Sequence, residues 1–402
     1  MTSPPDVLRV SYSSATRFRS CPRAWQFSAI EKLGPLESDP SLIDRDAGTW
    51  WHALRAADSI RRGIGSGTLC YLPDTLSTPD GFPDYETSVG SHAEEVIEHS
   101  WGWWNRLTSE AREAWLDRFH EPFPEYLGNL WDRYLDRWGD SLLNERPLAV
   151  ELPFTKRLSD DVELVGFVDE VFFDESKNLT VARDIKTHRT LKDSYAENDL
   201  MDSQNHLYAW AIAPTVAKWG YTLNATGYDR VRMNPPKQPQ LTKTGTLAKS
   251  VTDFDASTYE AFVGEGISWG EDGDFFKTGA RAGEAKFGIY RLESKVLENL
   301  RTPDALSQWH QRTLAPLNRN VIRAHVHSLT STADRMLTTR AALEAGEAEA
   351  PRNLTRLGCS WCDFQKLCRA MIFGGPDGDY PLEDFGLQKR DRRTQLESRK
   401  ML

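Results

Sequence analysis

The chain has 402 residues, of which 39% are hydrophobic and 27% charged, so it is long enough for a large core and for two or three domains. It has no run of about 20 apolar residues and no basic N-terminal segment followed by an apolar one, so we expect a soluble protein that is not exported. The formal net charge of -10 argues against general nucleic-acid binding, but it is compatible with a local basic groove.

The N-terminal segment predicts three helices. Residues 11–33 predict two short ones, because Pro22 suits the first turn of a helix, and Cys21 then lies at their junction. Residues 47–63 predict a longer helix that ends at Gly63.

A tryptophan-rich stretch over residues 64–146 predicts an insertion made mainly of helices. Aromatic residues at helical spacing are usually core, so we favour packed helix faces over base-stacking platforms. The tryptophans in this stretch that bear on the choice are Trp101, Trp103, Trp104, Trp115, Trp131 and Trp138.

The middle of the chain predicts a meander of antiparallel strands. Strand-like runs cover residues 148–158, 162–173 and 179–188, and a polar turn of hairpin length, DESKN, joins the last two. A helix is predicted over residues 203–219, and Pro214 should kink or interrupt it.

The rest of the chain is less regular. Residues 221–233 predict another strand, and residues 234–254 predict an irregular loop that carries prolines and lysines. Residues 303–346 are predicted to be mostly helical, and the tail after Pro376 is polar and basic.

Two carboxylates and a lysine fall on the predicted hairpin. Side chains at i and i+2 of a strand share a face, so Asp184 and Lys186 project together while Ile185 points into the core. Asp169 comes from the preceding strand, and cross-strand neighbours lie about 5 Å apart. A divalent cation relieves the repulsion between two such carboxylates, and oxygen ligands suit Mg²⁺ or Mn²⁺. Glu151, on the strand before, fits a third carboxylate of this site or an ordinary structural residue equally well.

Four of the five cysteines suit a metal centre. Cys359, Cys362 and Cys368 are clustered, and Cys21 lies far from them in sequence. Four thiolates satisfy either zinc or a 4Fe-4S cluster, but zinc ribbons usually pair two Cys-x2-Cys knuckles and this chain has one. Such a centre would hold the two ends of the chain together. Cys70 is expected to be a small buried hydrophobic residue.

These segments together resemble the PD-(D/E)xK nuclease superfamily, and within it the RecB-like iron-sulfur exonucleases, which include CRISPR adaptation nucleases, AddB nuclease domains and phage exonucleases. The resemblance covers the two ends and the middle of the chain, but not residues 64–146 or the stretch after residue 255. The matching segments, in the family's order, are SCPRAWQF, GTWWHAL, GFVDEV, DIKT, QNHLYAWA and CSWCDFQKLC.

The resemblance implies an α/β fold with a restriction-endonuclease-like core, a central mixed sheet flanked by helices, a helical insertion and an iron-sulfur lobe. The catalytic residues that it implies are Asp169, Asp184, Lys186, Gln204 and Tyr208. The residues that it implies for a Mn²⁺ or Mg²⁺ site are His52, Asp169, Asp184 and Ile185. The ligands that it implies for a 4Fe-4S cluster are Cys21, Cys359, Cys362 and Cys368.

The predicted elements and the resemblance together suggest five segments along the chain. They are an N-terminal segment with a cluster cysteine and the metal-binding histidine (1–63), a helical insertion (64–146), a nuclease core (147–255), a helical region with the cysteine cluster (256–375) and a polar basic tail (376–402).

The function implied is that of a metal-dependent DNA exonuclease acting on DNA ends, with single-stranded ends favoured, in the cytoplasm of a bacterium or a phage-infected cell. The chain has no Gly-x4-Gly-Lys-Ser/Thr loop, so a helicase or recombination partner would supply any ATP-driven step. Two alternatives are a catalytically inert module that binds single strands or DNA ends, and a zinc-stapled scaffold. Candidate DNA contacts are Arg17, Arg19, Arg23, Lys237, Lys243, Lys249, Arg352, Arg356, Lys366 and Arg369.

Overall fold

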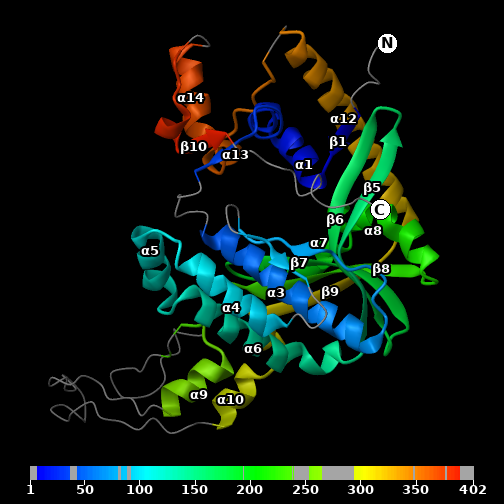
Figure 1. Ribbon diagram of the computed structural model, residues 1–402, viewed down its shortest axis with the longest axis vertical. Coiled ribbons are helices and arrows are strands. Elements are labelled where there is room, and N and C mark those ends of the chain that lie inside the picture. Colours follow the sequence, from blue (N-terminus) through cyan, green and yellow to red (C-terminus); the bar gives the residue numbers. More distant parts are fainter. Residues whose placement is uncertain are drawn as a thin grey trace, which may run out of the picture. The chain divides into compact units, whose positions relative to one another are not determined.

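The computed structural model of the chain describes residues 7–36, 43–79, 83–87, 92–192, 194–237, 239, 253–264, 294–346, 349–375 and 378–389 (Figure 1). Within these residues no helix is both long and apolar enough to cross a membrane. The chain divides into two compact units. The first comprises Met1–Ile185, Ser194–Tyr228 and Thr313–Leu402, and the second comprises Lys186–Asp193 and Asp229–Arg312.

The central sheet has six strands: β1 (Leu8–Val10), β5 (Glu145–Ser159), β6 (Val162–Asp174), β7 (Leu179–His188), β8 (Leu223–Arg232) and β9 (His310–Pro316). Their order is β1-β6-β7-β8-β9, with β5 also paired to β6. β1 is parallel to β6, whereas the β5–β6 and β6–β7 pairs are antiparallel. The predicted meander and mixed sheet are therefore confirmed.

Helices of the first unit flank this sheet: α1 (Tyr12–Ser20), α2 (Pro22–Trp25), α3 (Ile43–Ser66), α4 (Ala93–Trp104), α5 (Ser109–Phe119), α6 (Phe123–Leu142), α7 (Tyr195–Asp199), α8 (Ser203–Lys218) and α12 (Arg319–Glu344). α3 packs on β5 and on α4, and α4 packs on α6. α8 packs on β5 and on α12, and α1 also contacts α12. The predicted α/β class, a mixed sheet flanked by helices, is confirmed.

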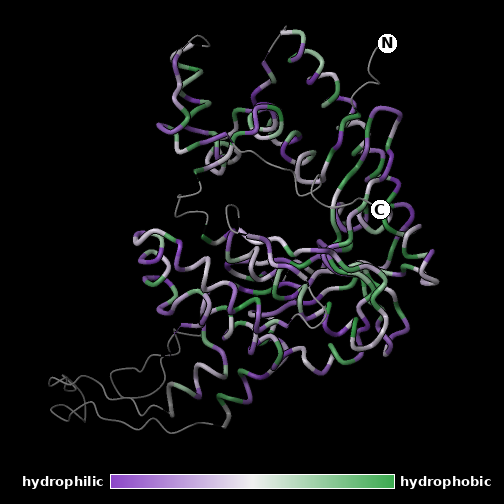
Figure 2. The backbone as a smooth tube through the Cα atoms, viewed as in Figure 1, coloured by the Kyte–Doolittle hydropathy of each residue, from purple (hydrophilic) through white to green (hydrophobic). Residues whose placement is uncertain are grey.

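The core of the first unit forms where the apolar faces of these strands and helices meet. Leu152, Leu164, Leu207 and Leu329, from β5, β6, α8 and α12, are each at most 1% exposed. Figure 2 shows hydrophobic residues concentrated along the long strands. Burying such side chains contributes about 1.5–3 kcal/mol each, which makes this sheet a firm base for a site.

Pro214 does not interrupt α8, which continues to Lys218 because burial of its apolar residues outweighs the lost main-chain hydrogen bond. Residues 303–346 are mostly helical, as predicted, and β9 separates the short helix α11 (Pro303–Ser307) from α12. One residue differs from its prediction. Cys70 is exposed rather than buried. Its N–H donates to the Leu148 carbonyl, so the main chain of this loop is held while the thiol faces outward.

The tryptophan-rich stretch forms α4, α5 and α6, as predicted. Trp103, Trp104, Trp115 and Trp131 are at most 5% exposed. Ring contacts such as the edge-to-face pair of Trp103 and Phe123, with centroids 5.1 Å apart, hold these helices together. For these four residues the core interpretation is confirmed.

A smaller group of elements brings distant parts of the first unit together. We call it the cysteine lobe, residues 21–36, 349–375 and 378–389. In it β2 (Leu33–Pro35) pairs antiparallel with β10 (Leu387–Lys389), so the two ends of the chain share a two-stranded sheet. Its other elements are α2, η1 (Gln26–Ile30), α13 (Arg356–Ser360), α14 (Gln365–Gly374) and η3 (Leu382–Phe385).

The second unit carries two further helices beside α11, which are α9 (Ala256–Gly264) and α10 (Ser294–Leu300). Arg301 pairs with Glu260 at 2.7 Å and so links the end of α10 to α9. Arg232, at the end of β8, donates to both carboxylate oxygens of Asp253. The predicted phosphate contact Lys237 lies 3.6 Å from the same aspartate, so that carboxylate already offsets its charge.

Candidate active site

The β6–β7 ladder ends beside the two predicted carboxylates. Its last pair is Glu170 with Arg183, and Asp169 and Asp184 are the next residues on the two strands. Beyond this pair, the N–H of Ile185 donates to Asp169 Oδ2 at 2.6 Å. The Asp169 carboxylate thus accepts a hydrogen bond that a main-chain carbonyl of the ladder would otherwise accept. This hydrogen bond holds Asp169 against β7.

Two other elements bring ligating groups to Asp169. His52 Nδ1, on α3, lies 3.6 Å from Asp169 Oδ2. Glu151 lies opposite Asp169 in the β5–β6 ladder, because its neighbours on both sides pair with the neighbours of Asp169. One ligand atom from each of the three side chains lies within 4.8 Å of the others, and the described residues contain no second group of three His, Cys, Asp or Glu side chains this close. One imidazole nitrogen and two carboxylates form a donor set that suits Mn²⁺ or Mg²⁺.

Glu151 holds an unusual backbone conformation within β5. Its φ is +49°, in the left-handed region that costs a non-glycine residue about 1–3 kcal/mol. Strain of this kind persists where the surrounding structure over-determines it, and it clusters at functional sites. The conformation and the position opposite Asp169 together favour the metal-site interpretation of Glu151 over the structural one.

α8 brings the two predicted helix residues to the carboxylates. Gln204 Nε2 donates to Asp184 Oδ1 at 3.4 Å. Tyr208 follows one turn later, and its ring packs edge-to-face on Phe154 with centroids 4.9 Å apart. Burial raises the pKa of Tyr208 well above its usual value, and the negative charges of Asp184 and Asp169 raise it further. Tyr208 therefore remains a neutral hydrogen-bond donor.

Ile185 and Lys186 follow Asp184 directly on β7. The Ile185 side chain is 3% exposed and aliphatic, so only its main-chain carbonyl could bind a metal. Strand alternation puts Lys186 on the same face of β7 as Asp184.

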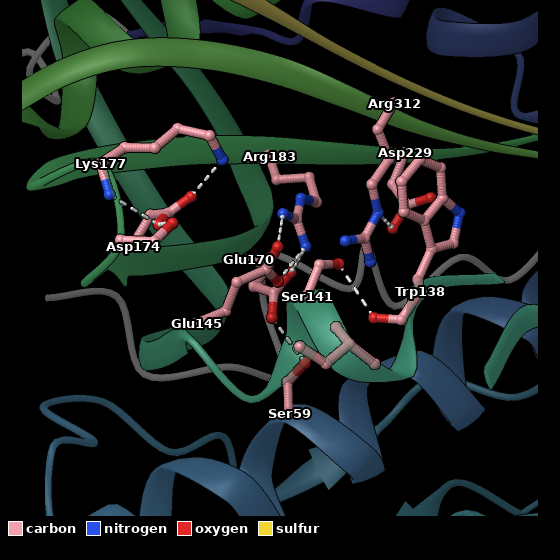
Figure 3. Close-up of polar contacts among 12 residues, drawn as sticks. Ser59, Trp138, Ser141, Glu145, Glu170, Asp174, Lys177, Arg183, Asp229 and Arg312 are labelled. Atoms are coloured by element: carbon pink, nitrogen blue, oxygen red, sulfur yellow. Dashed lines mark hydrogen bonds and ion pairs between the residues drawn. The ribbon is translucent and has the colours of Figure 1, made fainter. Parts of the chain in front are cut away.

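A buried ionic network lies next to the carboxylates in sequence (Figure 3). Arg183 donates to both oxygens of Glu145, at 2.7 and 2.8 Å, and to Glu170 at 3.0 Å. Ser59 of α3 donates to Glu170 at 2.6 Å. All four residues are at most 6% exposed. Removing one partner from such a network leaves a buried charge uncompensated, so the network holds β5, β6, β7 and α3 in one arrangement.

The helix α3 links this network to the metal-binding group. Ser59 and His52 are seven residues apart, two turns along the helix, and so lie on one face. Arg62 extends the contact, since it donates to Asp58 at 2.8 Å and lies 3.4 Å from Glu170. The helix face that carries the candidate ligand His52 therefore also carries Ser59, which anchors the helix to Glu170.

The sequence profile of the PD-(D/E)XK nuclease superfamily matches residues 9–369, which include every residue of the site described above. The chain belongs to the PD-(D/E)XK nuclease superfamily. A search of curated proteins finds no match. Nucleases of this superfamily use divalent metal ions, and the group of His52, Glu151 and Asp169 can hold one.

Sequence patterns alone did not single out the network of this PD-(D/E)XK nuclease. The missed residues are Ser59, Glu145, Glu170 and Arg183. A usable signal was present, because Glu170 and Arg183 are charged residues within apolar strand segments and each is adjacent to a predicted carboxylate. Charged residues are almost never fully buried unless paired, so such positions predict a partner across the fold.

The four predicted cluster cysteines line one cavity of about 820 Å³, whose other lining residues come from the cysteine lobe, from α1 and from Gln204 of α8. Cys21 ends α1 and precedes α2, as predicted from Pro22. Cys359 is on α13, Cys362 is in the following turn and Cys368 is on α14.

The thiols of the lobe interact with one another. Burial raises the pKa of the Cys362 thiol, and the charges of Cys21, Asp363 and Cys368 raise it further, while a main-chain hydrogen bond at Phe364 opposes the shift. Neighbouring thiolates in a partly buried site repel each other, and a bound cation relieves that repulsion. The donor set thus fits a thiolate-bound metal centre.

The basic residues predicted near the cysteines do not all face solvent. Arg17 and Arg369 line the cavity and are exposed. Arg23 is 3% exposed and donates to Gln26 and Glu349, so its charge is already used within the lobe. Lys366 and Arg19 are also exposed. Lys243, Lys249 and the Arg356 side chain lie outside the described residues, as does the end of the basic tail.

Proposed function

We propose that the chain is a metal-dependent DNA exonuclease that hydrolyses phosphodiester bonds at DNA ends, with single-stranded ends favoured. The observation that carries this proposal is the group of His52, Glu151 and Asp169 beside the point where the β6–β7 ladder stops. The imidazole nitrogen is a softer donor than a carboxylate, which favours Mn²⁺ over Mg²⁺.

In this proposal the ion is held by His52, Glu151, Asp169, Asp184 and the main-chain oxygen of Ile185. When bound, a divalent ion lowers the pKa of a water and offsets the charge that develops during attack on phosphorus. Lys186 stabilises that charge on the phosphate oxygens or helps to position and deprotonate the attacking water.

The helix residues act as neutral donors. Gln204 holds Asp184 through its amide, which keeps the carboxylate oriented. Tyr208 keeps its proton because burial and the carboxylates oppose ionisation, so it can donate to a substrate phosphate. Phosphate contacts of this kind position a strand without reading its bases, so we expect sequence-independent cleavage.

We also propose a structural 4Fe-4S cluster on Cys21, Cys359, Cys362 and Cys368, with zinc as the alternative. The support is that all four cysteines line one cavity and that Cys21, Cys362 and Cys368 pack against the same small apolar core. Visible absorption together with iron, sulfide and zinc content distinguishes the two, because zinc has no visible absorption. A colourless protein with one zinc per chain would contradict the cluster.

The proposed exonuclease has its core in residues 147–255, with residues 64–146 as a helical insertion and residues 256–375 leading to the cysteine cluster. The remaining parts are the N-terminal segment 1–63 and the tail 376–402. A helicase or recombination partner, in the cytoplasm of a bacterium or a phage-infected cell, would present the DNA ends.

The test is cleavage of end-labelled linear DNA, single- and double-stranded, with Mn²⁺ or Mg²⁺, by the wild type and by Asp184→Ala and Lys186→Ala. The matched control is Lys177→Ala, which removes a half-exposed lysine that pairs with Asp174 at the other end of the same hairpin. We expect cleavage by the wild type and the control only, and release of mononucleotides from linear but not circular strands.

Equal cleavage by the wild type and both site variants would rule out the proposed site. Cleavage of circular strands at the same rate as linear ones would indicate an endonuclease and not an exonuclease. Binding of ends without cleavage under any divalent metal would favour an inert end-binding module.

A further inference from the structure

Two aromatic side chains stand out on the surface of the cysteine lobe. Trp361 is 86% exposed and Phe373 is 79% exposed, more than any other large hydrophobic residue in the described part of the chain. Trp and Phe otherwise supply core and interface area, and an aromatic surface this exposed marks a place where another molecule binds.

Both aromatics belong to one cavity. Trp361 lies between Cys359 and Cys362 in the chain, and Phe373 is in the last turn of α14. Both line the 820 Å³ cavity of the lobe, together with the exposed Leu354 and Ile372. The apolar surface is therefore continuous with a hollow rather than scattered over the lobe.

The charge of this cavity indicates which class of ligand it binds. Four arginines line it, Arg17, Arg23, Arg352 and Arg369, against one acidic residue, Asp363. Asp363 lies 3.9 Å from Arg17, and Glu349 pairs with Arg23 and Arg352, so the positive charge left for a ligand comes mainly from Arg17 and Arg369. The Arg369 guanidinium lies 5.9 Å from the centroid of the Phe373 ring, so cation and ring are adjacent. A positive hollow with exposed rings suits single-stranded nucleic acid.

The same cavity reaches the candidate active site. Gln204, whose amide donates to Asp184, is one of its lining residues. Tyr12 also lines it, and its hydroxyl lies 2.5 Å from that of Ser203, the residue before Gln204. A strand with one end at the carboxylates can thus continue along the cavity wall towards the aromatics.

We propose that Trp361 and Phe373 form a stacking platform for unpaired bases of the DNA strand that is being cut, with Arg17 and Arg369 contacting its phosphates. The proposal rests on the proposed nuclease function and adds where the strand lies outside the active site. A protein partner is less well matched, because the exposed arginines Arg17 and Arg369 lie beside the rings and the cavity leads towards the candidate carboxylates. Every base has an aromatic face, so the platform is indifferent to sequence.

The test measures equilibrium binding of a labelled oligothymidylate by anisotropy, in EDTA so that no cleavage occurs. Trp361→Ala and Phe373→Ala should each weaken binding about tenfold, within the range reported for loss of one stacked base. Trp361→Phe should retain most of the affinity, because it keeps a ring. The control is Leu143→Ala, which removes an exposed apolar side chain that does not line the cavity and is itself 71% exposed.

The salt dependence of binding distinguishes the contribution of the aromatic rings from that of the arginines. Each phosphate contact contributes about 0.7 to the slope of log affinity against log salt for single strands. Arg369→Ala should therefore reduce the slope by about that amount, whereas Trp361→Ala should lower affinity and leave the slope unchanged.

Unchanged binding by both alanine variants would overturn the platform, and so would failure of Trp361→Phe to bind better than Trp361→Ala. A shift from dimer to monomer in sedimentation of Trp361→Ala would also overturn it, in favour of a protein interface. The readout is binding without metal, so these outcomes are independent of the cleavage assay. If the wild type cleaves DNA and Trp361→Ala binds it normally, the platform is ruled out while the proposed nuclease function stands.

Discussion

The candidate active site and the cysteine lobe are built in opposite ways. The site stands on long strands and on a network of residues at most 6% exposed, so the chain's own packing holds it. The lobe consists of short elements around a small core that includes Phe27, Phe364 and Leu367. Its four cysteines line a cavity instead of filling one. The comparison indicates that the site is preorganised by protein contacts, whereas the lobe would depend on the centre that we propose for its cysteines.

The largest effect on stability should come from removing Arg183, the centre of the buried network. Arg183→Ala removes the guanidinium that binds both oxygens of the buried Glu145, and leaves Glu170 with the longer contacts to Arg62 at 3.4 Å and Arg55 at 3.9 Å. It should lower the free energy of unfolding by about 3–5 kcal/mol. Lys177→Ala is the control from the same hairpin, because the lysine is more than half exposed and the buried Asp174 keeps hydrogen bonds from Ser176 and from the main chain of residue 177. Its loss of stability should therefore be smaller than that of Arg183→Ala. Urea denaturation measures both, and equal losses would show that the network does not support the site.

The next largest effect should fall on the lobe alone. Cys362→Ser removes one thiolate from the centre and should destabilise the lobe by about 2–4 kcal/mol, the range for a crosslink that closes a long loop. Limited proteolysis should then cut residues 349–375 much faster while the main unfolding transition is retained. Cys70→Ser, which changes an exposed thiol outside the cavity, is the matched control. Loss of the whole fold in Cys362→Ser would show that the two regions are not independent.

A smaller effect is expected at the metal-binding group. Glu151→Gln keeps the size of the side chain and removes its charge, and should weaken Mn²⁺ binding about 10- to 100-fold without loss of stability. Titration calorimetry measures the affinity. Glu163→Gln, which only loosens a surface pair with Arg9 at 3.6 Å, should bind as the wild type does.

The strained backbone of Glu151 provides a second test of whether this residue serves the metal site or the fold. Glu151→Gly relieves the positive φ and should raise the free energy of unfolding by about 1 kcal/mol while it weakens metal binding. A variant that loses both stability and affinity would mean that Glu151 is structural.

The smallest effect concerns Tyr208. Its pKa is raised in the folded protein, so above pH 10, its usual value, the unfolded chain loses a proton that the folded chain keeps. Stability contributed by this group is complete below about pH 10 and falls as the pH rises. Tyr208→Phe should be less sensitive to alkaline pH, and its cleavage rate should fall about fivefold for the loss of one hydrogen bond. Thermal unfolding between pH 8 and pH 11 tests this, and identical alkaline sensitivity would contradict it.

Local spacing was sufficient to group the carboxylates and the lysine of the candidate site: Asp184, Lys186 and Asp169 follow from strand alternation and a hairpin turn. Gln204 and Tyr208 were implied by the resemblance to the PD-(D/E)xK nucleases, and helix periodicity adds only that they share a face. These relations involve residues close in sequence, so the geometry of one or two elements decides them. The role of Glu151 could not be decided from the sequence, because it depends on the β5–β6 register and on a backbone conformation that the residue type does not predict.

The sequence by itself determined the order of the elements, the hairpin with its carboxylates and lysine, and the four cysteines suited to one metal centre. Only the tertiary structure decided which charges are buried together, because Ser59 and Glu170, 111 residues apart, meet across the packed core. It also decided that Trp361 is exposed while Trp103 and Trp115 are core, since exposure depends on what packs against a helix or turn and not on the residue itself.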